Sequence, residues 1–297
     1  MTQHAQPQQD FDLEAYLALT PEKASLPALT VEEEAGPLAK YFHETIPTPD
    51  PEHLAMMAEP CDPAKAIGPE QLNDLLDPGY LETETGWCNL ENGAGFIANR
   101  MFYPNATAEM FDWWFAWHPM QDLRYRIWYP DYHAGTKISP QDRARLMDAS
   151  IPLSERNQGC VHHVTENTGC GMENIAIHFL SPEDMGFDMS RFKRPNIASF
   201  AGGFGLSAPV IRKKDTIPAP AIMCHTFREK DGGLEHRTRF WLGYLIKDKR
   251  PELMLPPGIA IPPFVIKGLA EHCVHEFTRL GEMLPRIHAE LGAGPIA

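Results

Sequence analysis

Disulfide-forming motifs are missing from this sequence. Its six cysteines include no Cys-x-x-Cys pair, and in a chain of 297 residues they do not make the dense framework of a small disulfide-stapled domain. We therefore expect reduced thiols and a cytoplasmic protein. The sequon-like Asn105-Ala106-Thr107 then has no meaning for glycosylation.

Long hydrophobic runs and an excess of positive charge are missing as well. No apolar stretch approaches the roughly 20 residues that span a bilayer. The chain opens on MTQHAQPQQD, which lacks the apolar region of a signal peptide. With 26 Lys and Arg against 40 Asp and Glu, the net charge is −14, which argues against a nucleic-acid groove. We expect no membrane and no nucleic acid among the partners.

The composition changes near residue 85. Residues 1–85 are Pro-rich and acidic, with short helical patches such as EEEAGPLAKYFHETI and GPEQLNDLL. We predict an N-terminal extension over 1–85, mostly helical, whose first dozen residues are disordered. The rest of this extension is expected to lie over a larger body or to make contacts in a homodimer. Residues 86–297 form the predicted main domain.

Strand-like and helical patterns in the main domain predict an α+β fold. The ENGAG turn, the run CVHHVTE and the alternating runs on either side of KDGG (230–233) indicate antiparallel strands. DLRYRIWYP also alternates like a strand, whereas TAEMFDWWFAWH predicts a helix. The chain ends in a long amphipathic helix, about 264–291, with Pro285 inside it. A curved antiparallel sheet gripped by this helix is the most economical arrangement.

One stretch of the C-terminal helix, LAEHCVHEFTRL, concentrates histidine and glutamate. At about 100° per residue, His272 and Glu276 fall within or at the edge of the apolar arc, whereas Glu271 and His275 face water. A buried ionised glutamate is costly unless it is paired or bound to a metal ion. An inward His/Glu pair at i, i+4 can bind one ion. A buried His–Glu hydrogen bond without a metal fits the helix geometry equally well. The apolar arc consists of Leu269, Cys273, Leu280, Met283, Leu284 and Ile287.

Two residues elsewhere could complete such a site. His133 lies just beyond the strand-like run that contains Tyr125, and in VHHVTENTG the alternation puts His162 and Glu166 on one strand face. His133 and Glu166 together with the helix pair supply two nitrogens and two carboxylates, a plausible Zn²⁺ set. The competing interpretation is that these polar strand residues are simply exposed.

The hairpin offers a possible acid–base pair. His225 follows the apolar run AIMC, and Glu235 lies on the other side of the turn. A histidine facing an acid can exchange protons with a substrate. An exposed cross-strand pair of marginal stability is the alternative, and the residues by themselves favour it.

Four motifs in this order resemble the diacetylphloroglucinol hydrolase/phloretin hydrolase family. They are WWFAWHP (113–119), RYRIWYPDYH (124–133), VTENTG (164–169) and HCVHE (272–276). The resemblance covers the chain from about 85 to the C-terminus, and the N-terminal segment matches only loosely. It implies a helix-grip (Bet v 1-like) catalytic domain, a catalytic zinc ion and an extension that assists dimerisation.

The resemblance also implies roles for individual residues. A family tyrosine falls on Tyr125, and a general acid/base histidine falls on His225, with Glu235 as its partner. The zinc ligands of the family fall on His133, Glu166, His272 and Glu276.

The implied reaction is hydrolysis of the C–C bond between an acyl group and a phloroglucinol-type ring. The substrate would be a small aromatic ketone, such as phloretin or mono- or diacetylphloroglucinol. One alternative is a non-catalytic helix-grip carrier of hydrophobic small molecules, but a carrier has no reason to bury two glutamates and two histidines. Another is a non-haem iron enzyme, whose facial triad usually offers one carboxylate, so that two glutamates favour zinc.

Overall fold

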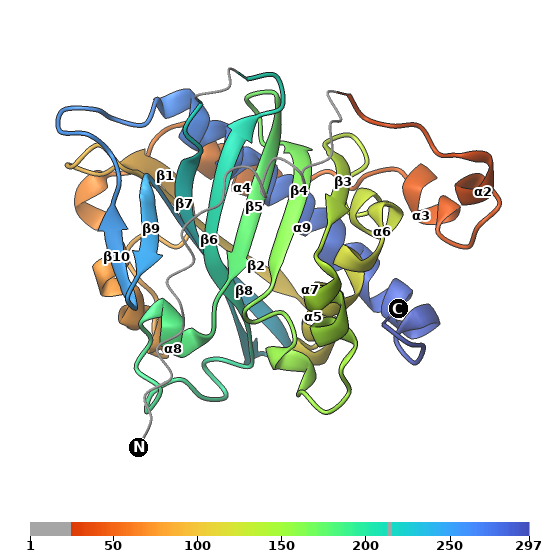
Figure 1. Ribbon diagram of the computed structural model, residues 1–297. Helices are drawn as coiled ribbons and strands as arrows, with labels where there is room; N and C mark the ends of the chain where they lie inside the picture. The colour runs from red at the N-terminus through yellow and green to blue at the C-terminus, as the bar shows by residue number, and fades with distance from the viewer. Residues whose placement is uncertain (1–24, 213–215, 297) are drawn as a thin grey trace.

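A large antiparallel sheet forms the centre of the computed structural model, which describes residues 25–212 and 216–296 (Figure 1). Its eight strands lie in the order β1-β2-β8-β7-β6-β5-β4-β3, and two further strands, β9 and β10, pair separately. The strands are β1 (Gly86–Asn89), β2 (Gly95–Tyr103), β3 (His133–Lys137), β4 (Val161–Asn167), β5 (Met172–Phe179), β6 (Ser199–Pro209), β7 (Ala219–Lys230), β8 (Gly233–Leu242), β9 (Tyr244–Lys247) and β10 (Arg250–Leu253).

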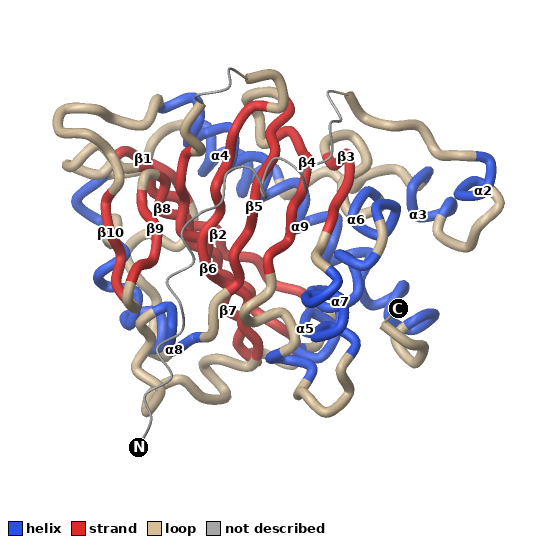
Figure 2. The backbone as a smooth tube through the Cα atoms, viewed as in Figure 1, coloured by secondary structure: helices blue, strands red, loops and turns tan. Residues whose placement is uncertain are grey.

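The helices surround this sheet, and Figure 2 shows that most of them are short. The disorder expected for the first dozen residues concerns a segment outside the described residues. The helices are α2 (Val31–Glu34), α3 (Ala39–His43), α4 (Pro51–Ala58), η1 (Pro63–Lys65), η2 (Pro69–Leu76), α5 (Ala108–Trp117), η3 (His118–Met120), α6 (Asp122–Arg126), α7 (Pro140–Met147), η4 (Leu153–Glu155), α8 (Pro182–Met185) and α9 (Pro263–Leu291).

Helix α9 runs diagonally across one face of the sheet (Figure 1). Its start is held beside β1, where Asn89 Nδ2 donates to the carbonyl oxygen of Ile261 at 2.9 Å. Farther along, Trp128 Nε1 donates to the carbonyl oxygen of Glu276 at 2.9 Å. The helix is therefore hydrogen-bonded to β1 near its start and to the segment before β3 farther along.

Both faces of the sheet are covered, because successive residues of a strand point to opposite sides. In β2, Ile97 belongs to the apolar cluster under α9 and α5, whereas Phe96 belongs to a second cluster on the other face. Leu72, Leu75 and Leu76 of η2 fill that second cluster. The combination of helices with a mainly antiparallel sheet agrees with the predicted α+β class.

The predicted β7–β8 hairpin is confirmed. Lys230 pairs with Gly233 across a two-residue turn. Asp231 (φ 50°) and Gly232 (φ 78°) both adopt the left-handed conformation that such turns require. This turn fixes which residues face one another along the whole hairpin.

The predicted strand at DLRYRIWYP is wrong. Residues Asp122–Arg126 form helix α6, and the strand β3 begins only at His133. The alternation was misleading because Arg124 and Arg126 are as buried as the apolar residues between them. Arg124 donates to the carbonyl oxygens of Trp117 and Ile296, so its position in the pattern did not mark a solvent-facing side.

The described part of the N-terminal extension is attached to the body by apolar packing and by polar contacts. Arg279 of α9 donates to the carbonyl oxygen of Tyr41 at 2.7 Å and to the Glu44 carboxylate at 2.8 Å. Trp241 Nε1 donates to the carbonyl oxygen of Ile67 at 2.8 Å. The domain boundary at 85/86 stays a prediction. In the described residues, no helix combines the length and apolarity needed to cross a bilayer.

Candidate metal centre and its surroundings

Helix α9 supplies the first half of the site. His272 and Glu276 are 5% and 8% exposed, whereas the Glu271 side chain is 47% exposed. Since α9 packs its apolar arc on the sheet, the i, i+4 spacing brings His272 and Glu276 to the inward side. The predicted inward pair is the one that the structure buries.

Strands β3 and β4 supply the second half. His133 opens β3 and is the register partner of Glu166 in β4, and both side chains are buried. A bulge between His133 and Gly135 interrupts the ladder at this point. Bulges re-aim side chains, and here the His133 ring lies against α9.

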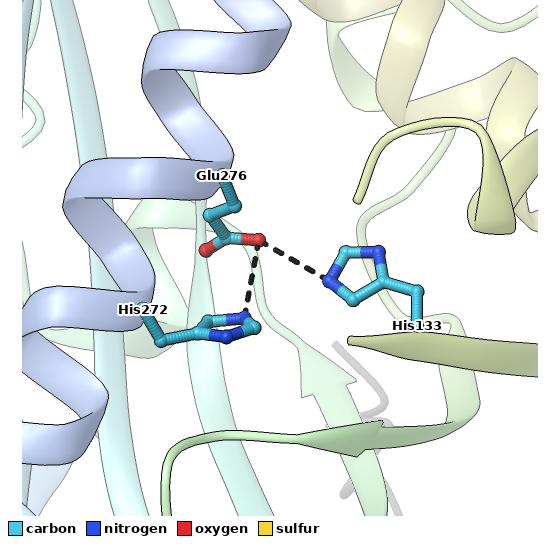
Figure 3. Close-up of side chains that lie close together, drawn as sticks. All are labelled: His133, His272 and Glu276. Atoms are coloured by element: carbon cyan, nitrogen blue, oxygen red, sulfur yellow. Dashed lines mark ion pairs between the residues drawn. The ribbon is translucent and has the colours of Figure 1, made fainter. Parts of the chain in front are cut away.

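The four side chains meet in the interior. His133 Nε2 lies 3.1 Å from Glu166 Oε2 and 3.6 Å from Glu276 Oε2. His272 Nε2 lies 3.5 Å from Glu166 Oε2 and 3.7 Å from Glu276 Oε2. Figure 3 shows the imidazoles of His133 and His272 converging on one carboxylate oxygen of Glu276. Ligand atoms of these three residues all lie within 4.8 Å of one another.

Tyr125 of α6 contacts both strand residues of this group, His133 and Glu166. Its ring stacks on His133 with centroids 4.1 Å apart, and its Oη donates to Glu166 Oε2 at 2.7 Å. The Tyr125 carbonyl oxygen accepts from His133 Nδ1 at 3.2 Å. With Nδ1 donating to that carbonyl oxygen, His133 turns Nε2 towards the Glu166 and Glu276 carboxylates. Nε2 is buried and lies within ion-pair distance of both, but none of these contacts has hydrogen-bond geometry among the described residues.

The two buried carboxylates of this group favour positive charge between them, as the pKa values of all four side chains indicate. Burial disfavours charge on His272, but Glu276 and Glu166 outweigh it and raise its pKa to about 10. Burial acts in the same sense on His133, and the same carboxylates raise its pKa. Burial would raise the pKa of Glu166 and Glu276, yet the two imidazoles lower both. The two negative charges of the carboxylates can therefore be balanced either by two protons on the imidazoles or by one divalent cation.

His225 lies nearby on β7, buried at 2% exposure. Its Nδ1 lies 3.0 Å from His236 Nε2 and 3.1 Å from Thr238 Oγ1. Its ring packs on Phe277, the neighbour of Glu276 in α9, with centroids 4.9 Å apart. Burial lowers the pKa of His225 to about 4, against the opposing pull of Glu276. His225 is thus a neutral imidazole at neutral pH.

The predicted pairing of His225 with Glu235 is wrong. The hairpin register sets His225 opposite Thr238 and Glu235 opposite Arg228. Since 225 and 235 then point to opposite faces of the sheet, Glu235 forms a buried ion pair with Arg228 and accepts from Tyr80 Oη at 2.8 Å. Its carboxylate stabilises the far face and does not touch His225.

Three buried histidines near the site were given no catalytic role by sequence reasoning. His236 contacts His225 directly. His118 directly follows α5; its Nδ1 donates to the Trp114 carbonyl oxygen at 2.7 Å, and its ring stacks on Tyr125 with centroids 5.9 Å apart. His162 shares a strand face with Glu166, and its buried Nε2 has no hydrogen-bond partner in the part of the chain that the structure describes. For His162 and His236, the alternation of side chains along β4 and β8 was the sequence signal that could have placed them on the same sheet face as Glu166 and His225.

Comparison with known proteins gives a consistent set of relatives. A sequence model described as "DAPG hydrolase PhiG domain" matches residues 67–289. A phloretin hydrolase from Eubacterium ramulus is 31% identical over 265 residues, which cover 87% of this chain and 92% of that protein. A 2,4-diacetylphloroglucinol hydrolase from Pseudomonas sp is 28% identical over 273 residues, which cover 86% of this chain and 88% of that protein.

A third relative and one solved structure complete the comparison. A 2,4-diacetylphloroglucinol hydrolase from Pseudomonas protegens is 27% identical over 273 residues, 86% of this chain and 85% of that protein. The crystal structure of Ara h 8.0201 covers 65% of this chain and 98% of its own at 10% identity, with a TM-score of 0.39. A likeness at that level carries no argument.

Proposed function

This chain belongs to the DAPG hydrolase PhiG domain family, and on that premise we propose that it is a zinc-dependent hydrolase. The bond cleaved is the C–C bond between an acyl group and a phloroglucinol-type ring, as in 2,4-diacetylphloroglucinol or phloretin-like substrates. The relatives are named for these two substrates. The observation that carries the proposal is the buried cluster of two imidazoles and two carboxylates.

The donor set suits zinc. His133 and His272 offer nitrogens, Glu166 and Glu276 offer oxygens, and Zn²⁺ takes both in four-coordinate sites. His133 Nε2 is buried, faces both carboxylates and has no contact of hydrogen-bond geometry in the described part of the chain, and a cation bound between these groups would satisfy it. A facial-triad iron site usually has one carboxylate, so the second glutamate favours zinc.

Zinc, when bound, would supply a Lewis acid that polarises the oxygens of the substrate and stabilises developing negative charge. The chain's own residues then handle protons and positions. Tyr125 holds the Glu166 carboxylate through its Oη and His133 through its carbonyl oxygen, so that both ligands keep one orientation.

His225 is the proposed general base and acid. Its neutral ring can take a proton from water at Nε2 while the oxygen of that water bonds to the acyl carbon. The same proton then passes from Nε2 to the ring carbon as the C–C bond breaks. The hydroxyl group of the water thus ends in the acid product, and its proton ends on the phloroglucinol ring.

Three further features belong to this proposal. The sheet with α9 across it fits the helix-grip (Bet v 1-like) architecture, and we assign residues 86–297 to the catalytic domain. Residues 1–85 would support a homodimer. The protein would work in the cytoplasm. A non-catalytic carrier of hydrophobic molecules is the alternative, and the buried charged cluster disfavours it, because two unneeded buried carboxylates are costly.

The proposal is tested by assaying phloretin, monoacetylphloroglucinol and 2,4-diacetylphloroglucinol and identifying the acid released. Glu276→Ala should abolish cleavage and remove the metal. Glu271→Ala is the matched control, because Glu271 lies on the same helix but faces water. Absence of cleavage of all three compounds by the zinc-loaded protein would refute the proposed reaction.

A further inference from the structure

A chain of buried hydrogen bonds begins at His225 and runs through His236 to Tyr103. His225 Nδ1 lies 3.0 Å from His236 Nε2, and His236 Nδ1 lies 3.1 Å from Tyr103 Oη. Tyr103 Oη in turn donates to Met101 Sδ at 3.4 Å. Thr238 Oγ1 is within reach of both imidazoles, at 3.1 Å from His225 Nδ1 and 2.8 Å from His236 Nε2.

The sheet fixes this chain in place. His225 belongs to β7, His236 and Thr238 to β8, and Tyr103 to β2, and these three strands are neighbours. His236 is fully buried, and its ring lies between Phe227, at 4.3 Å and nearly parallel, and Phe277, at 4.5 Å. The plane of the His236 ring is therefore set by packing, before any substrate enters.

One direction of the hydrogen bonds satisfies every member of this chain. A thioether sulfur can only accept, so Tyr103 Oη can donate to Met101 Sδ and at the same time accept the Nδ1 proton of His236. In this arrangement His236 Nε2 carries a lone pair and can accept the Nδ1 proton of His225. Neutral His225 then carries no proton on Nε2, the nitrogen that has to act as a base.

We propose that His236 is a positioning residue that holds His225 in the tautomer with its Nε2 lone pair free for the reaction. This inference rests on the proposed function, and it makes His236 the partner of His225 in place of Glu235, which the sequence had suggested. When His225 accepts a proton from water at Nε2, its Nδ1–H keeps donating to His236. The imidazolium is thus stabilised by a fixed neutral acceptor, and the proton can go on to the ring carbon.

A purely structural role does not explain the polar chain. An apolar side chain of the same shape could fill the space between Phe227 and Phe277, whereas burying an imidazole costs free energy unless its ring nitrogens are hydrogen-bonded. The bonds from His236 to His225 and Tyr103 use both of its ring nitrogens. They give the buried ring a function that only an imidazole or another acceptor can perform.

The kinetic test compares two substitutions of His236. His236→Phe keeps the ring volume but removes the acceptor, and we expect kcat to fall about 10- to 100-fold with KM changed less than about threefold and zinc retained. His236→Gln can still accept from His225 Nδ1 and should recover a large part of kcat. Thr226→Val is the control, because it removes a buried hydrogen bond between the same two strands on the other face.

A double-mutant comparison separates positioning from stability. If His236 acts only through His225, then His236→Phe should lower kcat no further in a His225→Gln background. An equal loss in both backgrounds, or an equal loss in Thr226→Val, would overturn the inference, since each would show a general effect on the fold.

The tautomer itself is measurable without any substrate. Long-range ¹H–¹⁵N spectra of the zinc-loaded protein should show His225 protonated at Nδ1 and bare at Nε2. His236→Phe should weaken this preference, because only Thr238 Oγ1 is left as an acceptor for Nδ1, while Thr226→Val should leave it unchanged. The opposite tautomer in the unsubstituted protein would overturn the inference. Because the NMR measurement needs no turnover, it tests the tautomer of His225 even if the proposed reaction is wrong.

Discussion

Tyr125 Oη donates to Glu166 Oε2 at 2.7 Å, and the same carboxylate oxygen lies 3.1 Å from His133 Nε2. Tyr125 thus touches both β-strand residues of the candidate metal centre, one through its hydroxyl group and the other through its ring and carbonyl oxygen. A residue that orients ligands in this way controls how strongly the metal is held and how the substrate meets it.

Tyr125→Phe should therefore impair the enzyme while the fold is kept. The ring still stacks on His133, but Glu166 loses a charge-assisted hydrogen bond, and we expect a loss of about 10- to 100-fold in activity or zinc affinity. Zinc titration and steady-state kinetics measure this. Tyr80→Phe is the control, because Tyr80 makes the same kind of bond to Glu235, and unchanged activity in Tyr125→Phe would contradict the role given to Tyr125.

His225→Gln should reduce kcat by about 10²- to 10⁴-fold, the range of general acid–base catalysis, and leave bound zinc unchanged. His178→Gln offers a matched histidine on the other face of the sheet, stacked on Phe204 at 4.8 Å. Equal kinetic effects of the two substitutions would remove His225 from the mechanism.

Zinc affinity should rise with pH. The pKa of His272 is raised to about 10 in the metal-free site, so at neutral pH a proton occupies the nitrogen that zinc needs. Binding must release that proton, and apparent affinity should increase about tenfold per pH unit for each proton released between about pH 6 and 8. Competition with a chromophoric chelator at several pH values measures the slope. A slope of zero would mean that His272 does not bind the metal.

Acid should destabilise the fold through Glu84, which pairs with Arg237 and Arg239 on the face of the sheet opposite His225. Burial would raise its pKa, but Arg239 and Arg237 outweigh burial and lower it to about 2. Since this value is below the usual 4.5, the stabilisation is present above about pH 4.5 and is lost as pH falls towards 2.

Glu84→Gln should accordingly lower the free energy of unfolding by about 3–5 kcal/mol at neutral pH, because two buried guanidinium groups lose their carboxylate. The difference from the unsubstituted protein should shrink below pH 4. Denaturant unfolding at a series of pH values provides the measurement. A difference that persists undiminished at the lowest pH would contradict the assignment to this ion pair.

Local periodicity predicted the parts of the fold that depend on one element at a time. The apolar arc of α9 was sufficient to place His272 and Glu276 inward, because helix geometry is regular over many turns. The turn at Asp231 and Gly232 was equally clear, since its left-handed residues have a strong sequence preference.

Relations between elements were harder to predict. The alternation around Tyr125 looked like a strand because nothing in the sequence shows that Arg124 and Arg126 are buried and hydrogen-bonded by other segments. The wrong pairing of His225 with Glu235 could have been avoided from the sequence. A two-residue turn at 231–232 already determines that His225 faces position 238. The register, counted from the turn, leads to His236 on the face of His225.

The zinc assignment is tested most directly by the metal content of the purified protein, measured together with its cleavage of 2,4-diacetylphloroglucinol and phloretin. We predict about one zinc ion per chain, lost together with cleavage in Glu276→Ala and retained with cleavage in Glu271→Ala. Protein without bound metal, or undiminished cleavage in Glu276→Ala, would contradict the central claim that this buried cluster is a catalytic zinc site.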